Sequence, residues 1–289
     1  MIQIENNHIS ISVNQMGAEL QSIYSKDNQL EYLWNGDPAF WGKKSPVLFP
    51  IVGGLKNNTY KHKGLSYQLS RHGFAREMEF TLSAKSKDSI SFTLNANKQT
   101  LEQYPFLFRF VITYSLHKNV LSCNYQVTNI DIKPMFFSVG AHPAFKVPLV
   151  DGTAFEDYHL LFESIETANQ WPLSTEGLIQ TAPIPFFDNT NRIDLVKDLF
   201  YGDALVFKQL KSNNISLLNA KNKHGFKIEY DQFPFMGIWS AKNADFVCIE
   251  PWCGIADSVD TTGELNQKEG INVLTPGELM SRTWSVELF

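Results

Sequence analysis

Cysteine is scarce in this sequence, with 3 in 289 residues. A small, odd number of cysteines excludes the disulfide framework that is typical of small secreted domains. The N-terminal segment MIQIENNHISISVNQMGAEL has neither a basic region nor an apolar core, so we expect no secretory signal peptide. Together these features favour a cytoplasmic protein.

Long hydrophobic runs are also missing. Proline, glycine, asparagine or a charged residue interrupts every apolar stretch before it reaches the ~18 residues that a membrane-spanning helix needs. Positive charge is not in excess, because 25 Lys and Arg against 30 Asp and Glu leave a net charge of -5. We therefore expect neither a membrane nor a nucleic acid as a partner.

Helical periodicity is almost absent, and short turns are predicted only at residues 97–104 and 198–202. Period-two alternation recurs instead, for example in the segments 110–116 and 121–127, which predict an antiparallel hairpin. Many strands without intervening helices predict an all-β fold, a large antiparallel β-sandwich. No repeat or break in composition divides the chain, so we expect residues 1–289 to form a single domain.

The sequence also lacks the motifs of bound cofactors. No G-x-G-x-x-G or phosphate-binding loop is present, which argues against a nucleotide cofactor. Cys248 and Cys253 have no second cysteine pair that would complete a zinc site. A facial triad of two histidines and Glu250 stays open as an alternative, although no HxH or HxE pairing supports it. We expect no metal and no cofactor.

Two ionisable residues stand out because each lies among apolar residues and precedes a proline. Glu250 ends the apolar segment FVCIE and precedes Pro251. A carboxylate on a buried strand face is energetically costly unless it forms an ion pair or has a functional role. His142 lies in the segment GAHPAF and precedes Pro143. The alternatives are a structural ion pair for Glu250 and a hydrogen-bonded core histidine for His142. His72, beside Arg71, is a weaker candidate, because it could lie in a charged loop.

Several motifs resemble one known family. HGFAR at 72–76, GAHPAF at 140–145, IEPWCGIAD at 249–257 and LTPGE at 274–278 are similar to segments of the aldose 1-epimerase (galactose mutarotase-like) family, and of its LacX-like branch in particular. The match extends from GAEL at 17–20 to the last predicted strand. The resemblance implies a β-supersandwich and an isomerase of carbohydrate metabolism. Such an enzyme interconverts the α and β anomers of a hexose without a cofactor.

The resemblance also implies roles for individual residues. Glu250 corresponds to the general base, His142 to the general acid and His72 to an assisting group, and Asp203 of GDALVF resembles a carboxylate that binds the substrate. A carboxylate close to His142 favours the charged imidazolium, so we expect the pKa of His142 to be raised.

The family's sugar-binding arginine is missing from the sequence. The corresponding stretch is GGLKNN at 53–58, so we expect Lys56 or Arg71 to replace this arginine. The identity of the sugar therefore stays open.

Two alternative functions remain. A mutarotase for a sugar phosphate would need cationic side chains at the rim of its cleft. The candidates are Lys43, Lys44, Lys56, Arg71 and Arg76. A non-catalytic sugar-binding or sensing protein would keep the pocket without turnover. In each case the expected partner is a small sugar or sugar phosphate, and the sequence indicates no particular oligomeric state.

Overall fold

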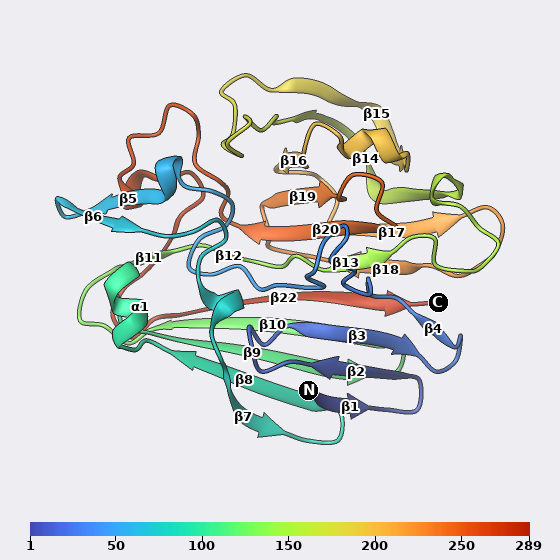
Figure 1. Ribbon diagram of the computed structural model, residues 1–289, viewed down its shortest axis with the longest axis horizontal. Helices are drawn as coiled ribbons and strands as arrows, with labels where there is room; N and C mark the ends of the chain where they lie inside the picture. The colour runs from blue at the N-terminus through green and yellow to red at the C-terminus, as the bar shows by residue number, and fades with distance from the viewer.

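The computed structural model describes residues 1–289, and antiparallel strands dominate it (Figure 1). The largest sheet has 14 strands. They are β7 (Thr81–Lys85), β8 (Ser89–Asn95), β9 (Phe108–His117), β10 (Val120–Asn129), β12 (Val139–Gly140), β13 (Ala144–Lys146), β14 (Tyr158–Gln170), β15 (Ile184–Asp194), β16 (Leu205–Lys208), β17 (Asn214–Asn219), β18 (Phe226–Glu229), β19 (Phe235–Trp239), β20 (Phe246–Cys253) and β22 (Leu279–Leu288).

Three smaller sheets complete the strand inventory. A four-stranded sheet contains β1 (Ile2–Glu5), β2 (Ile9–Val13), β3 (Leu20–Ser25) and β4 (Leu30–Glu31). Two further pairs are β5 (Thr59–His62) with β6 (Leu65–Gln68), and β11 (Met135–Phe137) with β21 (Asn272–Leu274).

Helices are few and short. They are α1 (Lys98–Gln103) and the 3-10 helices η1 (Lys56–Asn58), η2 (Ala75–Glu77), η3 (Phe155–Asp157), η4 (Lys197–Phe200) and η5 (Leu265–Gln267). The two helical turns predicted from the sequence correspond to α1 and η4. Asn97 caps α1 by accepting a hydrogen bond from the backbone N–H of Thr100, which explains why the helix begins there. None of these helices is long and apolar enough to cross a membrane.

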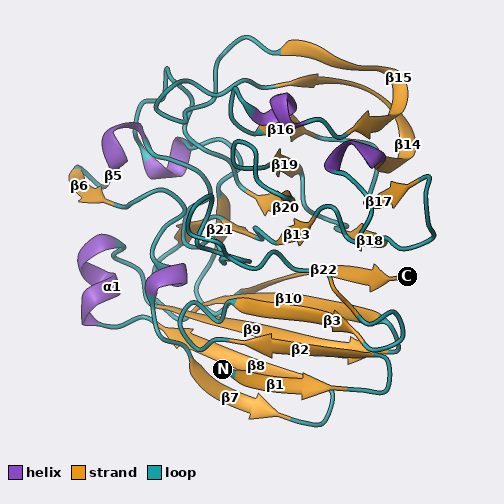
Figure 2. Cartoon of the chain, turned by 45° about the vertical axis from the view of Figure 1, so that its right-hand side comes forward, coloured by secondary structure: helices purple, strands orange, loops and turns teal.

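The strand order of the largest sheet is β12-β20-β19-β16-β14-β17-β18-β22-β10-β9-β8-β7, with β13 joined to β20 and β15 to β14. The sheet bends, so that β7 to β10 lie beside the four-stranded sheet while β14 to β20 form the other half of the molecule (Figures 1 and 2). The predicted hairpin is confirmed, because β9 and β10 pair from His117 and Val120 onward. The all-β prediction and the large antiparallel sandwich are likewise confirmed.

The core follows from the alternation in the strands. Along β9, residues are alternately buried and more exposed, so that one face of the strand packs inward. The main apolar cluster contains 66 buried residues and is rich in phenylalanine and tyrosine rings. It supplies the rigid support on which the irregular segments of the chain rest.

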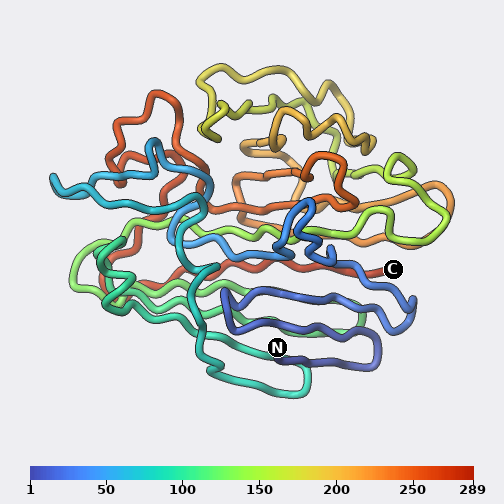
Figure 3. The backbone as a smooth tube through the Cα atoms, viewed as in Figure 1, coloured from blue at the N-terminus to red at the C-terminus, as the bar shows by residue number.

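The centre of the molecule joins three segments that are far apart in sequence. The backbone trace in Figure 3 shows the stretch after β4, in blue, near the stretch around β12 and near β20. Leu48 forms a bridge with Gly140, and Gly140 in turn pairs with Trp252. Glu250 lies on β20, His142 lies between β12 and β13, and His72 is hydrogen-bonded to Gly53 of the first segment.

Candidate active site

A cavity of about 710 Å³ opens over β20 and is lined by 20 residues. This volume lies within the range of small-molecule sites in proteins. Five of the six side chains singled out in the sequence line it, namely Arg71, His72, His142, Asp203 and Glu250. The sequence motifs of four separate segments thus meet in one cavity.

Glu250 lies on the floor of this cavity, in a strand whose eight residues are all buried. The sequence places Glu250 at the end of an apolar segment, with extended backbone before Pro251. The backbone is extended in the structure, but β20 continues past Glu250 to Cys253, and Pro251 pairs with Met236 of β19. Glu250 therefore projects from the middle of a strand that has neighbours on both sides, which holds its backbone rigidly.

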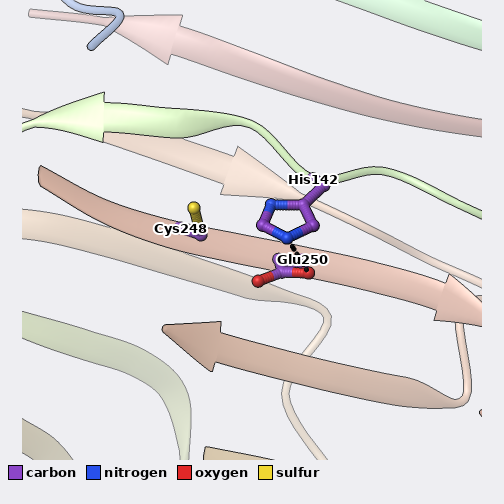
Figure 4. Close-up of side chains that lie close together, drawn as sticks. All are labelled: His142, Cys248 and Glu250. Carbon is purple, nitrogen blue, oxygen red and sulfur yellow. Dashed lines mark ion pairs between the residues drawn. The ribbon is translucent and has the colours of Figure 1, made fainter. Parts of the chain in front are cut away.

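His142 is brought opposite Glu250 by the strand register. Gly140 of β12 pairs with Trp252, and Ala144 of β13 pairs with Cys248. Because the two segments run antiparallel, the residue midway between Gly140 and Ala144 lies level with Glu250. The His142 Nε2 is 3.3 Å from the Glu250 Oε2, and Figure 4 shows the two side chains pointing toward one another. Both are buried, with 7% of His142 and 2% of Glu250 exposed.

Burial controls the ionisation of this pair. It lowers the pKa of His142 from 6.5 to about 3, and the charges of Arg76 and Arg71 act in the same direction. The expectation that the pKa of His142 is raised is therefore wrong, because the loss of hydration on burial is the largest effect on this group. Burial likewise raises the pKa of Glu250 well above its usual 4.5, opposed by Trp252 and Arg71 and reinforced by Asp203.

His72 enters the cavity from a strained turn. Its φ is 70°, a left-handed conformation that is uncommon for a residue with a side chain. Two contacts with Gly53 hold the turn: the His72 N–H donates to the Gly53 carbonyl at 2.8 Å, and the Gly53 N–H donates to the His72 Nδ1 at 3.1 Å. Such strain persists only where the surrounding structure fixes it, and it is typical of functional sites.

The ring of His72 has a defined role as a donor. Because Nδ1 accepts a hydrogen bond, the proton of the neutral ring lies on Nε2. Burial lowers the pKa of His72 well below 6.5, and the neighbouring His142, Arg76 and Arg71 lower it further. The ring stands nearly perpendicular to that of His142, with 5.5 Å between their centroids. His72 is therefore placed as a neutral N–H donor beside the pair.

Tryptophan rings enclose the imidazole of His142. Trp41 stacks on one face with a centroid distance of 4.9 Å and an interplanar angle of 24°. Trp239 meets it edge-on at 5.8 Å. Both rings also line the cavity. They exclude water from one side of the pair and offer aromatic surface that can cover the apolar face of a sugar.

Arginines mark the rim of the cavity. Arg71 is exposed and lies against Gly177, where any side chain would overlap the guanidinium. Arg76 has only a 3.8 Å contact with Glu77, and its Nε is buried without a hydrogen-bond partner. Burial lowers the pKa of Arg76. Two guanidinium groups without short ion pairs thus face the same cavity.

Asp203 reaches the cavity from the turn between η4 and β16. Its φ is 96°, again a left-handed conformation, and its Oδ1 accepts a hydrogen bond from the Ala204 N–H at 2.7 Å. The other carboxylate oxygen has no protein partner. Asp203 is therefore held as an acceptor that can bind hydroxyl groups.

Lys56 is the predicted residue that the structure places elsewhere. Its Nζ donates to the Val259 carbonyl at 2.7 Å, and it does not line the cavity. Of the two residues expected to replace the family's arginine, Lys56 or Arg71, only Arg71 lines the cavity. Lys43 and Lys44 are absent from the lining as well, and the Lys44 Nζ donates to the Gln21 carbonyl.

Sequence reasoning did not single out Trp41, Trp252 or the loop around Gly177. Trp41 lies in the polar stretch NGDPAFWGKK, which has no hydrophobic periodicity. Nothing in this stretch predicts that the Trp41 ring stacks on a distant histidine. Trp252 belongs to the IEPWCGIAD motif, so its place in that motif was a usable signal. The loop around Gly177 has no such signal.

A metal ion is the remaining possibility for these side chains. His142, Cys248 and Glu250 bring a nitrogen, a sulfur and an oxygen donor within 4.8 Å of one another. Zinc accepts all three donor types. Cys248, however, packs with Trp34 and Phe246 in an apolar cluster and does not line the cavity, and burial raises the pKa of its thiol. The environment of Cys248 therefore favours a packed thiol over a metal ligand.

Comparison with known proteins agrees with this geometry. Residues 1–286 match the family model described as aldose 1-epimerase. The chromosomal protein LacX of Lactococcus lactis subsp. lactis is 33% identical, and the match covers 99% of each chain.

Solved structures show the same relationship. A galactose mutarotase related enzyme from Lactobacillus acidophilus superimposes with a TM-score of 0.95 at 38% identity, over 100% of this chain and 97% of that one. A galactose mutarotase-like protein from Lactobacillus casei gives a TM-score of 0.90 at 32% identity, over 100% of both chains. The match of nearly the whole chain to the family model, together with this close relative, identifies the chain as a member of the aldose 1-epimerase family.

Proposed function

We propose that this protein interconverts the α and β anomers of a hexose. The observation that carries the proposal is the contact of 3.3 Å between the His142 Nε2 and the Glu250 Oε2 at the floor of the cavity. Ring opening needs one group that removes the proton of the C1 hydroxyl and one that protonates the ring oxygen. An adjacent carboxylate and imidazole fulfil both requirements without a cofactor.

In this mechanism Glu250 takes the proton of the C1 hydroxyl while His142 gives a proton to the ring oxygen. The C1–O5 bond breaks, the aldehyde rotates about C1–C2, and the same groups act in reverse during closure. The neutral His72 N–H and the Asp203 carboxylate bind sugar hydroxyls and orient the ring. No proton is gained or lost over the cycle.

The environment of Glu250 suits a base. Burial raises the pKa of Glu250 well above its usual 4.5, which makes the carboxylate a stronger base than a solvated one. The opposite pKa shifts place one proton of the pair on Glu250 at rest, and the 3.3 Å contact lets this proton pass to His142 Nε2. The reactive form, with Glu250 ionised and His142 protonated, is therefore a tautomer of the resting pair. A bound sugar supplies further hydrogen bonds to both groups.

The direct test is NMR saturation transfer between the two anomers of a free hexose. We expect exchange of magnetisation that increases with protein concentration over a panel of aldoses. A parallel measurement with the double variant Glu250→Gln/His142→Asn gives the buffer-catalysed background. Exchange by the wild-type protein no faster than this background, for every sugar tested, would disprove the activity.

A second candidate substrate class is a hexose phosphate. Arg71 and Arg76 both line the cavity, and neither forms a short ion pair in the protein. Unpaired guanidinium groups favour binding of a phosphate, which accepts paired hydrogen bonds from arginine. The same saturation-transfer panel, extended to phosphorylated hexoses, distinguishes the two classes by their kcat/KM values.

A further inference from the structure

Trp252 lies two residues after Glu250 on β20, so both side chains leave the same face of the strand. It is 6% exposed and lines the cavity. Its six-membered ring lies over Gly237 of β19, because a Cβ added at Gly237 would overlap the Cζ2 and Cη2 of Trp252. Gly237 is also the register partner of Glu250. The indole therefore extends back along the sheet to the level of the carboxylate.

The other end of the indole is accommodated in the same way. Gly140 of β12 is the register partner of Trp252, and a Cβ added there would come within 2.7 Å of the Trp252 Cδ1. The two strands that flank β20 thus both have glycine where the ring lies. We call the space left by Gly140 and Gly237 the glycine slot. The slot fixes the plane of the indole, because rotation would move the ring out of it.

The indole N–H is the feature that the slot positions. Nε1 is bonded to Cδ1 and Cε2 and so lies between the two ends held by the glycines. It is buried and has no hydrogen-bond partner in the protein. A buried donor without an acceptor is unusual and calls for an explanation. Trp252 does act on Glu250, since it lowers the pKa of this carboxyl against the larger effect of burial, which raises it.

We propose that Trp252 is a positioning residue for Glu250: the glycine slot holds the indole so that its N–H donates to the carboxylate whenever Glu250 is ionised. This inference deepens the proposed function and rests on it for the role of Glu250 as the base.

The indole differs from the other groups around Glu250. Four other side chains lie near Glu250 or shift its pKa, and each of them carries or can carry a charge: His142, Arg71, Asp203 and Cys248. Trp252 supplies a donor that does not titrate. It therefore favours the ionised base at every pH at which the protein is folded.

The first test is a ¹³C-NMR titration of protein labelled at the glutamate side-chain carboxyl carbons. The Glu250 signal is identified by its loss in Glu250→Gln. In Trp252→Phe, which keeps an aromatic ring but removes the N–H, we expect the Glu250 midpoint to move upward by about one pH unit. An unchanged midpoint in folded Trp252→Phe would overturn the proposal.

A second replacement separates the N–H from the packing. In β-(3-benzothienyl)alanine a sulfur stands in place of the indole N–H and the shape of the ring is retained. We expect this residue at position 252 to reproduce the upward shift even if Trp252→Phe fails to fold. The matched control is the same replacement at Trp171, which packs against the same apolar cluster but does not line the cavity. A shift of equal size in the control would count against the proposal.

Kinetics provide an independent readout. We expect kcat to fall about 10-fold in the Trp252 variants with little change in KM, and the acid limb of the pH profile to follow the Glu250 midpoint. A purely structural role would leave that limb in place. Absence of exchange in the wild-type protein would refute the proposed function, whereas the NMR titration tests Trp252 without any turnover.

Discussion

The floor and the rim of the cavity are built differently. The floor consists of β20 and the segment between β12 and β13, where register places His142 level with Glu250 and every residue of β20 is buried. The rim consists of turns that hold His72, Gly177 and Asp203 in left-handed conformations. A paired sheet fixes atoms closely, whereas turns can change length and composition at little cost. The comparison suggests that the floor carries the chemistry and the rim selects the substrate.

The largest expected effect is at the floor. Glu250→Gln and His142→Asn should each lower kcat by about 10²–10⁴-fold, because general acid–base catalysis contributes that much. Saturation transfer with a saturating sugar measures the loss, and circular dichroism checks the fold. Glu229→Gln is the control, since Glu229 is exposed on β18. Wild-type turnover in either floor variant would show that the floor does not carry the chemistry.

The second effect is on stability and concerns His142 at the floor, and His72 at the rim adds to it because burial lowers its pKa as well. The folded protein keeps His142 neutral to about pH 3, whereas the unfolded chain binds a proton near pH 6.5. The free energy of unfolding should therefore fall as the pH drops below 6.5, by about 1.4 kcal/mol per pH unit from this group alone. Urea unfolding of wild type and His142→Asn at pH 7 and pH 5 measures it. A slope that is equally steep in the variant would show that His142 is not the cause.

The third effect is at the rim and should fall on substrate binding. Arg76→Met should raise KM for a hexose phosphate by about 10-fold or more, with kcat nearly unchanged, because the lost guanidinium binds a group remote from C1. KM for the free hexose should change less. A fall in kcat with unaltered KM would instead place Arg76 in the chemistry and would blur the distinction between rim and floor.

The smallest effect is expected at Gly177. Gly177→Ala should raise KM a few-fold, because its φ of 75° and its contact with Arg71 leave no room for a methyl group. Lys56→Met is the matched control outside the cavity and should leave both kcat and KM unchanged. If Lys56→Met weakened binding as much as Gly177→Ala, the assignment of Gly177 to the rim and of Lys56 to the surface outside the cavity would be wrong.

Much of the fold could be predicted because its signals are local. The alternation in residues 110–116 and 121–127 is enough to predict the hairpin of β9 and β10, and Asn97 marks the start of α1. The candidate residues Glu250 and His142 were also visible, since each ionisable residue interrupts an apolar segment. The sequence could not decide between Lys56 and Arg71, because nothing in the neighbourhood of Lys56 reveals that the Val259 carbonyl accepts from its amine.

The sequence by itself determined the strand pattern, the absence of long helices and the types of side chain that are available for acid–base chemistry. Only the tertiary structure decided which of them meet. His142 lies opposite Glu250 because β12 and β13 both pair with β20. The position of the Trp252 ring depends on glycines in β12 and β19. The low pKa of His142 depends on burial by Trp41 and its neighbours. Register, packing and desolvation are properties of distant segments in contact, so no local pattern encodes them.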